Sequence, residues 1–190
     1  MLRRAVEFKS DRQSVPLRAD GGLRVGLVAD THSKPDLRGL EHLRALAPDV
    51  IFHAGDIGDL SVLDTFRAIA PVHAVRGNID ERELPDGLTL ELTHDGRTQL
   101  TIFLTHIALA GPRLRADAAK RARAVRASLV LCGHSHVPFA GQEKGLTVFN
   151  PGSIGPRRFT LPILFGVMEV GASGVTLRHV DCETGSRWEP

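Results

Sequence analysis

Two histidines one residue apart, His134 and His136, follow the apolar run LVLC and a glycine. A second pair with the same spacing, Asp30 and His32, follows the apolar run VGLVA. In extended backbone, residues i and i+2 point to the same side and lie about 6.5 to 7 Å apart. That separation is awkward for one small cation but suits two cations roughly 3.5 to 4 Å apart. Both pairs therefore indicate metal ligands where a strand passes into a loop.

Three more polar residues, Asp56, Asn78 and His106, end other apolar runs. Because ligands gather outside the carboxyl ends of strands in open α/β sheets, we expect all seven side chains to converge. The set holds carboxylates, an amide and imidazoles but no thiolate, which suits Mn, Fe, Zn, Ni or Co and disfavours calcium. Two carboxylates leave two divalent ions with a charge of about +2, which favours a phosphate ligand.

Taken singly, these residue types have simpler interpretations: a turn or core histidine, a helix N-cap for an aspartate, and a left-handed turn for an asparagine after glycine. The ordered set favours the metal site. The segment Asn150-Pro151-Gly152-Ser153 predicts a rigid turn near that site. Four arginines are either phosphate contacts or, as we favour, solvated surface charge: Arg76, Arg113, Arg157 and Arg158.

Strands and helices alternate in the first half of the chain. Three short apolar runs predict buried strands: 23–30, 49–56 and 72–78. Helical spacing of apolar residues predicts two helices between them, the first behind Pro35-Asp36 and the second behind Ser61, which resembles a capping box with Asp64. This alternation predicts an α/β domain with parallel strands.

The second half of the chain predicts an antiparallel hairpin around Asp95-Gly96 and a basic, alanine-rich helix over about 114–127. Four further strands are expected at 128–132, 146–150, 163–170 and 175–180. We expect one domain over 23–190. Residues 1–22 are polar, end in Gly-Gly and are interpreted as an N-terminal extension, partly disordered.

Composition describes an ordinary globular protein of 190 residues, 42% hydrophobic and 24% charged. The net charge of +2 is too small to indicate nucleic acid or membrane as a partner. No apolar run approaches the roughly 20 residues of a membrane span, and the N-terminus lacks the apolar stretch of a signal peptide. Cys132 and Cys182 are far apart and favour a reducing compartment, so the predicted location is cytoplasmic.

The chain resembles the calcineurin-like metallophosphoesterase superfamily, and within it the small bacterial and archaeal phosphodiesterase group, which includes the retromer scaffold subunit. The resemblance covers residues 24 to about 170 through an ordered set of motifs: D-T-H (30–32), G-D (55–56), G-N-x-D (77–80), a later histidine (106), G-H-S-H (133–136) and N-P-G-S (150–153). It implies a four-layer αββα sandwich of two mixed β-sheets flanked by helices, with a binuclear metal site along one edge.

Site roles follow from the resemblance, motif by motif. The implied cofactors are two divalent transition-metal ions, manganese first, with zinc, iron, nickel or cobalt as alternatives. The implied ligands are Asp30, His32 and His136 for the first ion, Asn78, His106 and His134 for the second, and Asp56 as the bridge between them. Asp80 would contact one of the metal ligands and orient it without binding the metal itself. The implied reaction is in-line attack of a metal-bound hydroxide on phosphorus, with Asp56, Asn78 and His134 as the catalytic ligands.

Two departures from the family's pattern bear on the reaction. Ile79 stands where larger members carry the histidine that protonates the leaving group, and Ile107-Ala108 replaces the usual Gly-His after His106. No general acid is therefore identified. Because acid catalysis is worth about 10²- to 10⁴-fold, activated aryl phosphates should be cleaved far more readily than alkyl phosphates.

The sequence thus predicts a metal-dependent phosphoesterase, by analogy a phosphodiesterase, acting on a small or nucleotide-like phosphate ester. The alternative is a non-catalytic protein-interaction scaffold of the same fold. All seven ligand positions favour the enzyme. Duplex DNA is not expected as a substrate, RNA and cyclic nucleotides remain open, and the sequence is compatible with a homo-oligomer.

Overall fold

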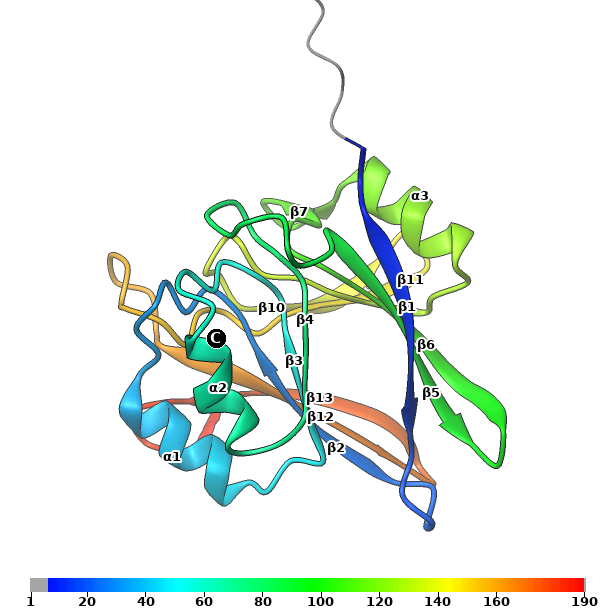
Figure 1. Cartoon of the computed structure of the whole chain (residues 1–190), viewed down its shortest axis with the longest axis horizontal. Coiled ribbons are helices and arrows are strands. Elements are labelled where there is room, and N and C mark those ends of the chain that lie inside the picture. Colours follow the sequence, from blue (N-terminus) through cyan, green and yellow to red (C-terminus); the bar gives the residue numbers. More distant parts are fainter. Residues whose placement is uncertain (1–6, 190) are drawn as a thin grey trace, which may run out of the picture.

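Two mixed β-sheets face each other in the computed structural model, which describes residues 7–189 (Figure 1). Sheet A contains, in spatial order, β1 (Ser10–Pro16), β5 (Gly87–His94), β6 (Arg97–Thr105), β9 (Leu129–Leu131), β11 (Leu146–Asn150) and β10 (Phe139–Glu143). Sheet B contains β14 (Arg187–Trp188), β13 (Gly174–Asp181), β12 (Leu164–Gly171), β2 (Leu23–Val28), β3 (Val50–His53) and β4 (Val72–Ala74). A separate small hairpin pairs β7 (Leu109–Ala110) with β8 (Arg113–Leu114).

Helices cover the outer faces of both sheets. α1 (Leu37–Ala45) and α2 (Val62–Arg67) pack on sheet B through leucines and Phe66, and α3 (Ala116–Ala124) packs on sheet A through alanines (Figure 1). The layers therefore run helix, sheet, sheet, helix. This arrangement confirms the predicted four-layer αββα sandwich of two mixed sheets.

Alternation of side chains along the strands builds three cores. In β9, Leu129 and Leu131 point into the core between the sheets, whereas Val130 points outward beneath α3. In β3, Phe52 faces the other sheet and Ile51 faces α1 and α2. Because both faces of these central strands are buried, their sequences read as continuous apolar runs.

Three parallel strands in each sheet end at the same edge of the sandwich. In sheet B, β2 pairs in parallel with β3, and β3 with β4. In sheet A, β6 pairs in parallel with β9, and β9 with β11. The polar residues that the sequence places after these strands are thereby brought together from two sheets.

The expected N-terminal extension over residues 1–22 is in part a strand. Residues 10–16 form β1, which pairs in parallel with β5 at the edge of sheet A and places Val15 in the central core. Residues 10–14 of this strand are polar because an edge strand faces solvent, which explains why the segment resembles a disordered extension. The part of that prediction that concerns residues 1–6 lies outside the described residues.

The first turns of α1 and α2 differ in how they are capped. The Asp36 carboxylate caps α1 by accepting a hydrogen bond from the Gly39 N–H at 2.8 Å. The capping box expected at Ser61 is wrong, because Ser61 itself has helical backbone angles and its side chain makes no capping hydrogen bond. Within residues 7–189, no helix is both long and apolar enough to span a bilayer.

Candidate metal centre

Six of the seven predicted ligands lie in two clusters at the edge where the parallel strands end. One cluster is Asp30, His32 and His136, and the other is Asp56, His106 and His134. Within each cluster, one potential ligand atom from every residue lies within 4.8 Å of the others. The division between the clusters is the same as the one implied by the family resemblance.

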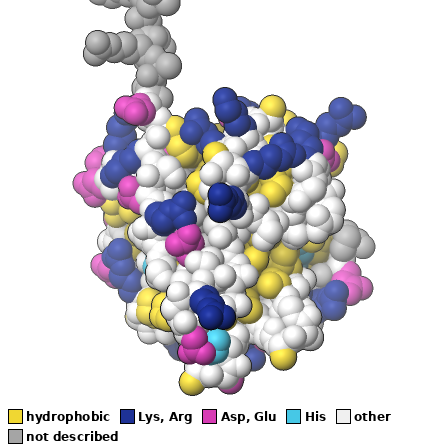
Figure 2. All heavy atoms as spheres, turned by 90° about the vertical axis from the view of Figure 1, so that its right-hand side faces the viewer, with side chains coloured by type: hydrophobic (Ala, Val, Ile, Leu, Met, Phe, Trp, Pro, Cys, Tyr) yellow, Lys and Arg dark blue, Asp and Glu magenta, His cyan; other side chains and the backbone are white. Residues whose placement is uncertain are grey.

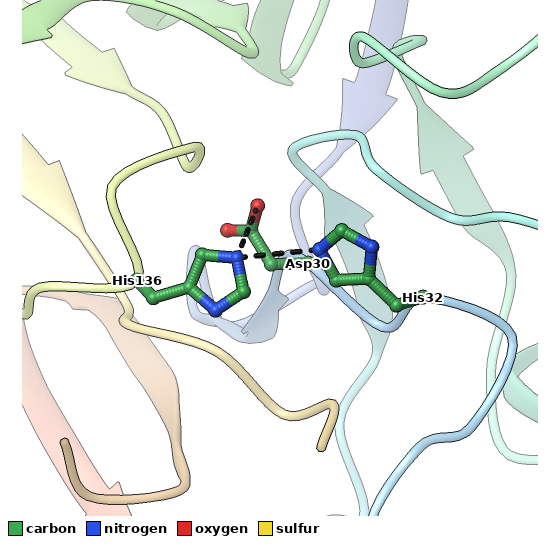
Figure 3. A group of neighbouring side chains, drawn as sticks. All are labelled: Asp30, His32 and His136. Carbon is green, nitrogen blue, oxygen red and sulfur yellow. Dashed lines mark hydrogen bonds and ion pairs between the residues drawn. The ribbon is translucent and has the colours of Figure 1, made fainter. Parts of the chain in front are cut away.

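In the first cluster the ligand atoms point at a common centre (Figure 3). His32 Nε2 lies 3.2 Å from His136 Nε2, which lies 3.5 Å from an Asp30 carboxylate oxygen. For metal–ligand bonds of about 2.1 Å, neighbouring ligand atoms lie about 3.0 Å apart in an octahedron and about 3.4 Å apart in a tetrahedron. The observed spacings therefore fit ligands of one transition-metal ion.

The second cluster contains an unpaired buried nitrogen. His106 Nδ1 lies 2.7 Å from the Ala54 carbonyl and donates its proton there, so in the neutral ring Nε2 carries a lone pair. This Nε2 is buried without a hydrogen-bond partner, although it lies 3.2 Å from Asp56 Oδ1. Two acceptors that face each other at this distance are stabilised by a shared proton or metal ion, so the cluster can hold a metal ion when the ring is neutral.

Asp56 stands between the two clusters. Its Oδ1 lies 3.2 Å from His106 Nε2, and its Oδ2 lies 3.8 Å from His32 Nε2 in the other cluster. Oδ1 also accepts hydrogen bonds from the backbone N–H groups of Asn78 at 2.5 Å and Ile79 at 3.3 Å. The position suits a bridging carboxylate, a role that stays a prediction.

Asn78, the seventh predicted ligand, is exposed at the rim of the second cluster. With His106 it lines a cavity of about 270 Å³, whose wall includes Arg76, Ile107 and Arg115. The contact to Asp56 comes from its backbone. Ligation by its side-chain amide therefore stays a prediction.

The loops that carry the ligands are joined to each other by backbone hydrogen bonds. The His32 N–H donates to the Asp56 carbonyl at 3.0 Å, so the loop after β2 continues the pairing of β2 with β3. The Asp80 carboxylate accepts from three backbone N–H groups, those of Ile57, Gly58 and Gly77, at 3.1, 2.8 and 2.7 Å. Asp80 thus fixes the loops that carry Asp56 and Asn78 and touches no ligand side chain by these bonds.

The ligands do not have the extended backbone assumed from their spacing. Five of them have positive φ: Asp30 (57°), His32 (45°), Asp56 (54°), His134 (74°) and His136 (59°). These are five of the eleven non-glycine residues with positive φ in the described chain, so left-handed backbone is concentrated at this site. Left-handed turns, rather than strand alternation, aim both members of each pair inward, which corrects the geometric basis of the prediction.

Gly133, Asn150 and Ser153 hold the histidine loop against Asp30. A Cβ on Gly133 would lie 2.8 Å from the Asp30 carboxylate, so only glycine permits this approach. The Asn150 amide donates to the Gly133 carbonyl at 2.8 Å, and the Ser153 hydroxyl donates to the Asp30 carbonyl at 2.9 Å. The N-P-G-S segment therefore positions two ligand loops, beyond the turn that its sequence predicts.

Charges within the site perturb one another strongly. Burial raises the pKa of Asp30 to about 7. Burial, with the nearby Arg158 guanidinium, lowers the pKa of His136 to about 4 and also depresses the pKa of His32. His106 shows the opposite balance: burial opposes its charged form, but the neighbouring Asp56 and Asp30 carboxylates raise its pKa above the usual value.

Arg158 was interpreted from sequence as solvated charge, yet one of its guanidinium nitrogens lies 3.1 Å from His32 Nε2. No sequence spacing distinguishes it from the adjacent Arg157. Its place at the site follows from the turn after the N-P-G-S segment, which the structure alone shows.

Comparisons with known proteins identify the family of the chain. Residues 23–173 match the family model of the calcineurin-like phosphoesterase superfamily domain. The chain is 30% identical over 139 residues to a probable metallophosphoesterase of Methanocaldococcus jannaschii, covering 70% of this chain and 69% of that protein.

Two solved structures share the fold. The Zn²⁺ complex of the vacuolar sorting protein Vps29 from Entamoeba histolytica aligns with a TM-score of 0.70 at 21% identity, covering 87% of this chain and 96% of that one. An archaeal phosphodiesterase aligns with a TM-score of 0.60 at 20% identity, covering 84% and 99%. With the family match over most of its length, the chain belongs to the calcineurin-like phosphoesterase superfamily.

Proposed function

We propose that this protein is a dinuclear metal-dependent phosphoesterase that hydrolyses phosphodiesters by in-line displacement at phosphorus. The observation that carries the proposal is the pair of ligand clusters joined by Asp56, with the unpaired Nε2 of His106 facing its carboxylate. Asp30, His32 and His136 would hold one ion, and Asn78, His106 and His134 the other.

When bound, two divalent ions would lower the pKa of a coordinated water and offset negative charge on the phosphoryl oxygens. The chain's own residues supply the rigid frame for that chemistry. Asp80 and Ser153 lock the ligand loops by hydrogen bonds to backbone groups. Ile79, which is 52% exposed beside Asn78, offers no proton to a leaving group. We therefore expect leaving groups of low basicity to be favoured.

Diester preference, manganese as the native ion and a cytoplasmic location complete the proposal. The mixed nitrogen and oxygen ligands suit manganese and also permit zinc, iron, nickel or cobalt. The archaeal phosphodiesterase with the same fold supports the diester preference.

A protein-interaction scaffold is the second candidate. The structural similarity to Vps29 supports it, because that protein shares the fold with a TM-score of 0.70. The intact ligand clusters favour the enzyme.

Metal analysis and reconstitution test the proposal. The purified protein, stripped with chelator and reloaded with Mn²⁺ or Zn²⁺, is assayed on bis(4-nitrophenyl) phosphate and on 4-nitrophenyl phosphate. We expect about two ions per chain, faster diester turnover, and loss of activity in Asp56→Asn. The control is Asp95→Asn in the exposed turn between β5 and β6, which should keep full activity. A reloaded protein that cleaves neither ester, or an Asp56→Asn variant as active as wild type, would contradict the enzymatic proposal.

A further inference from the structure

Two neighbouring arginines, Arg157 and Arg158, have different surroundings. One guanidinium nitrogen of Arg157 lies 2.7 Å from a Glu183 carboxylate oxygen and another donates to the Leu161 carbonyl at 3.0 Å. Arg158 has no carboxylate within ion-pair distance among residues 7–189. Its contact is with His32 Nε2, at 3.1 Å. Arg158 thus presents an unneutralised positive charge to the metal centre.

The chain that leads to Arg158 is anchored to the ligand loop. The Ile154 N–H donates to the Ala29 carbonyl at 3.2 Å, and the Ser153 hydroxyl donates to the Asp30 carbonyl. A Cβ on Gly155 would collide with the Asp30 carbonyl, so this approach requires glycine. Arg158 therefore lies three residues after Gly155, which is held against Asp30, and this contact places Arg158 beside the site.

The electrostatics agree with this placement. After the larger effect of burial, the Arg158 charge is the next cause that lowers the pKa of His32 and His136, so it acts mainly on the first cluster. His32 Nε2 has a single lone pair, which serves either a metal ion or the arginine. Metal binding would therefore release the guanidinium while leaving it next to the ion.

We propose that Arg158 binds the phosphoryl group of the substrate, with its guanidinium donating to the non-bridging oxygens beside the metal pair. This inference rests on the proposed function and deepens it. A guanidinium stays protonated, so Arg158 stabilises negative charge and transfers no proton. Its planar array of donors matches two phosphate oxygens at once. Arg158 would thus supply charge at a site where Ile79 replaces the acid histidine.

Binding and turnover are measured on Mn²⁺-loaded wild type and three variants: Arg158→Ala, Arg158→Lys and the matched control Arg157→Ala. Calorimetry with inorganic phosphate gives the affinity for the anion, kcat and KM are measured on bis(4-nitrophenyl) phosphate, and metal content is determined for each protein. Loss of a charge-assisted hydrogen bond should weaken phosphate binding by Arg158→Ala about 10- to 100-fold. The lysine variant should fall between, and Arg157→Ala should bind as wild type does, with equal metal content throughout.

Equal phosphate affinity and kcat/KM in Arg158→Ala and Arg157→Ala would overturn the inference while leaving the phosphoesterase proposal intact. Loss of metal from Arg158→Ala would also overturn it, because the residue would then support the ligands rather than the substrate. Wild-type protein that takes up no metal and cleaves no ester would instead refute the proposed function. The three results are distinguishable in one set of samples.

Discussion

Asp30→Asn should stabilise the metal-free protein, although it removes a predicted ligand. The Asp30 side chain is fully buried, and the backbone N–H of His134 is its only hydrogen-bond donor among the described residues, with N···O distances of 3.0 and 3.2 Å. Burial raises its pKa from the usual 3.8 to about 7. Asparagine has nearly the same shape, keeps an acceptor for that N–H and carries no charge.

The size of the effect follows from the pKa shift. Between pH 3.8 and about 7 the unfolded chain has lost the Asp30 proton while the folded chain retains it, so the free energy of unfolding falls as pH rises. Each unit of pKa difference corresponds to about 1.4 kcal/mol, which gives up to about 4 kcal/mol at pH 8. The stability linked to Asp30 is thus fully present below pH 3.8 and lost above about 7.

Urea denaturation with chelator, at pH 5 and pH 8, measures this effect. Asp30→Asn should exceed wild type in free energy of unfolding at pH 8, by up to about 4 kcal/mol, and the gain should shrink at pH 5. With Mn²⁺ the order should reverse. Asp56→Asn is the matched comparison: its carboxylate has a pKa lowered, against burial, by His106, so its loss should destabilise at pH 8. An Asp30→Asn variant less stable than wild type at pH 8 with chelator would refute the reasoning.

Three further predictions concern the surroundings of the site. Ile79→His, at a 52% exposed position, should raise the ratio of alkyl to aryl phosphodiester turnover by about 10-fold or more and add an acid-dependent limb to the pH profile of kcat. An unchanged ratio of alkyl to aryl turnover would contradict this prediction. His53 is buried and burial lowers its pKa to about 3, so the neutral ring stabilises the fold fully above pH 6.5 and less and less as the pH falls below that value. Wild type should therefore lose about 2 kcal/mol of unfolding free energy through His53 between pH 7 and pH 5, and His53→Gln should lack this loss in urea denaturation. A Cβ on Gly77 would collide with Asp56, so Gly77→Ala should weaken Mn²⁺ binding at least about 10-fold in a calorimetric titration, whereas Gly171→Ala, which meets no atom within 4 Å, should not.

The central strands and helices were predictable because buried elements have a clear pattern of apolar residues in the sequence. β2, β3 and β9 are almost entirely buried on both faces and so read as mainly apolar runs, interrupted only by Arg24 in β2 and His53 at the end of β3. The turn at Asp95-Gly96 marks the hairpin of β5 and β6. Two edge strands of sheet A lack such patterns and are not predicted: the polar β1, and β10, whose alternate residues Ala140 and Gln142 are exposed. An edge strand forms by pairing with the free N–H and C=O groups of the neighbouring strand, and its own residues need not be apolar for that pairing.

The convergence of the candidate ligands was predictable for a different reason. The ligands follow the ends of parallel strands, and that rule alone brings Asp30 and Asp56 together from one sheet and His106 and His134 from the other. The geometry within each pair was not predictable from spacing, because left-handed backbone depends on contacts with neighbouring loops. Arg158 is one of four arginines that the sequence allows as phosphate contacts, and the sequence does not single it out because a turn places it beside His32.

The backbone conformation and burial of the candidate ligands lower the stability of the metal-free protein. Five ligands adopt left-handed backbone, at about 1 kcal/mol or more each, and Asp30 is buried with its charge opposed by its surroundings. A bound cation offsets these terms, because it pairs with the Asp30 carboxylate and with the lone pair of His106. A scaffold that never binds metal would carry the costs without that compensation. The energetics of the described site therefore favour a bound metal ion over a permanently metal-free site, independently of any resemblance to known proteins.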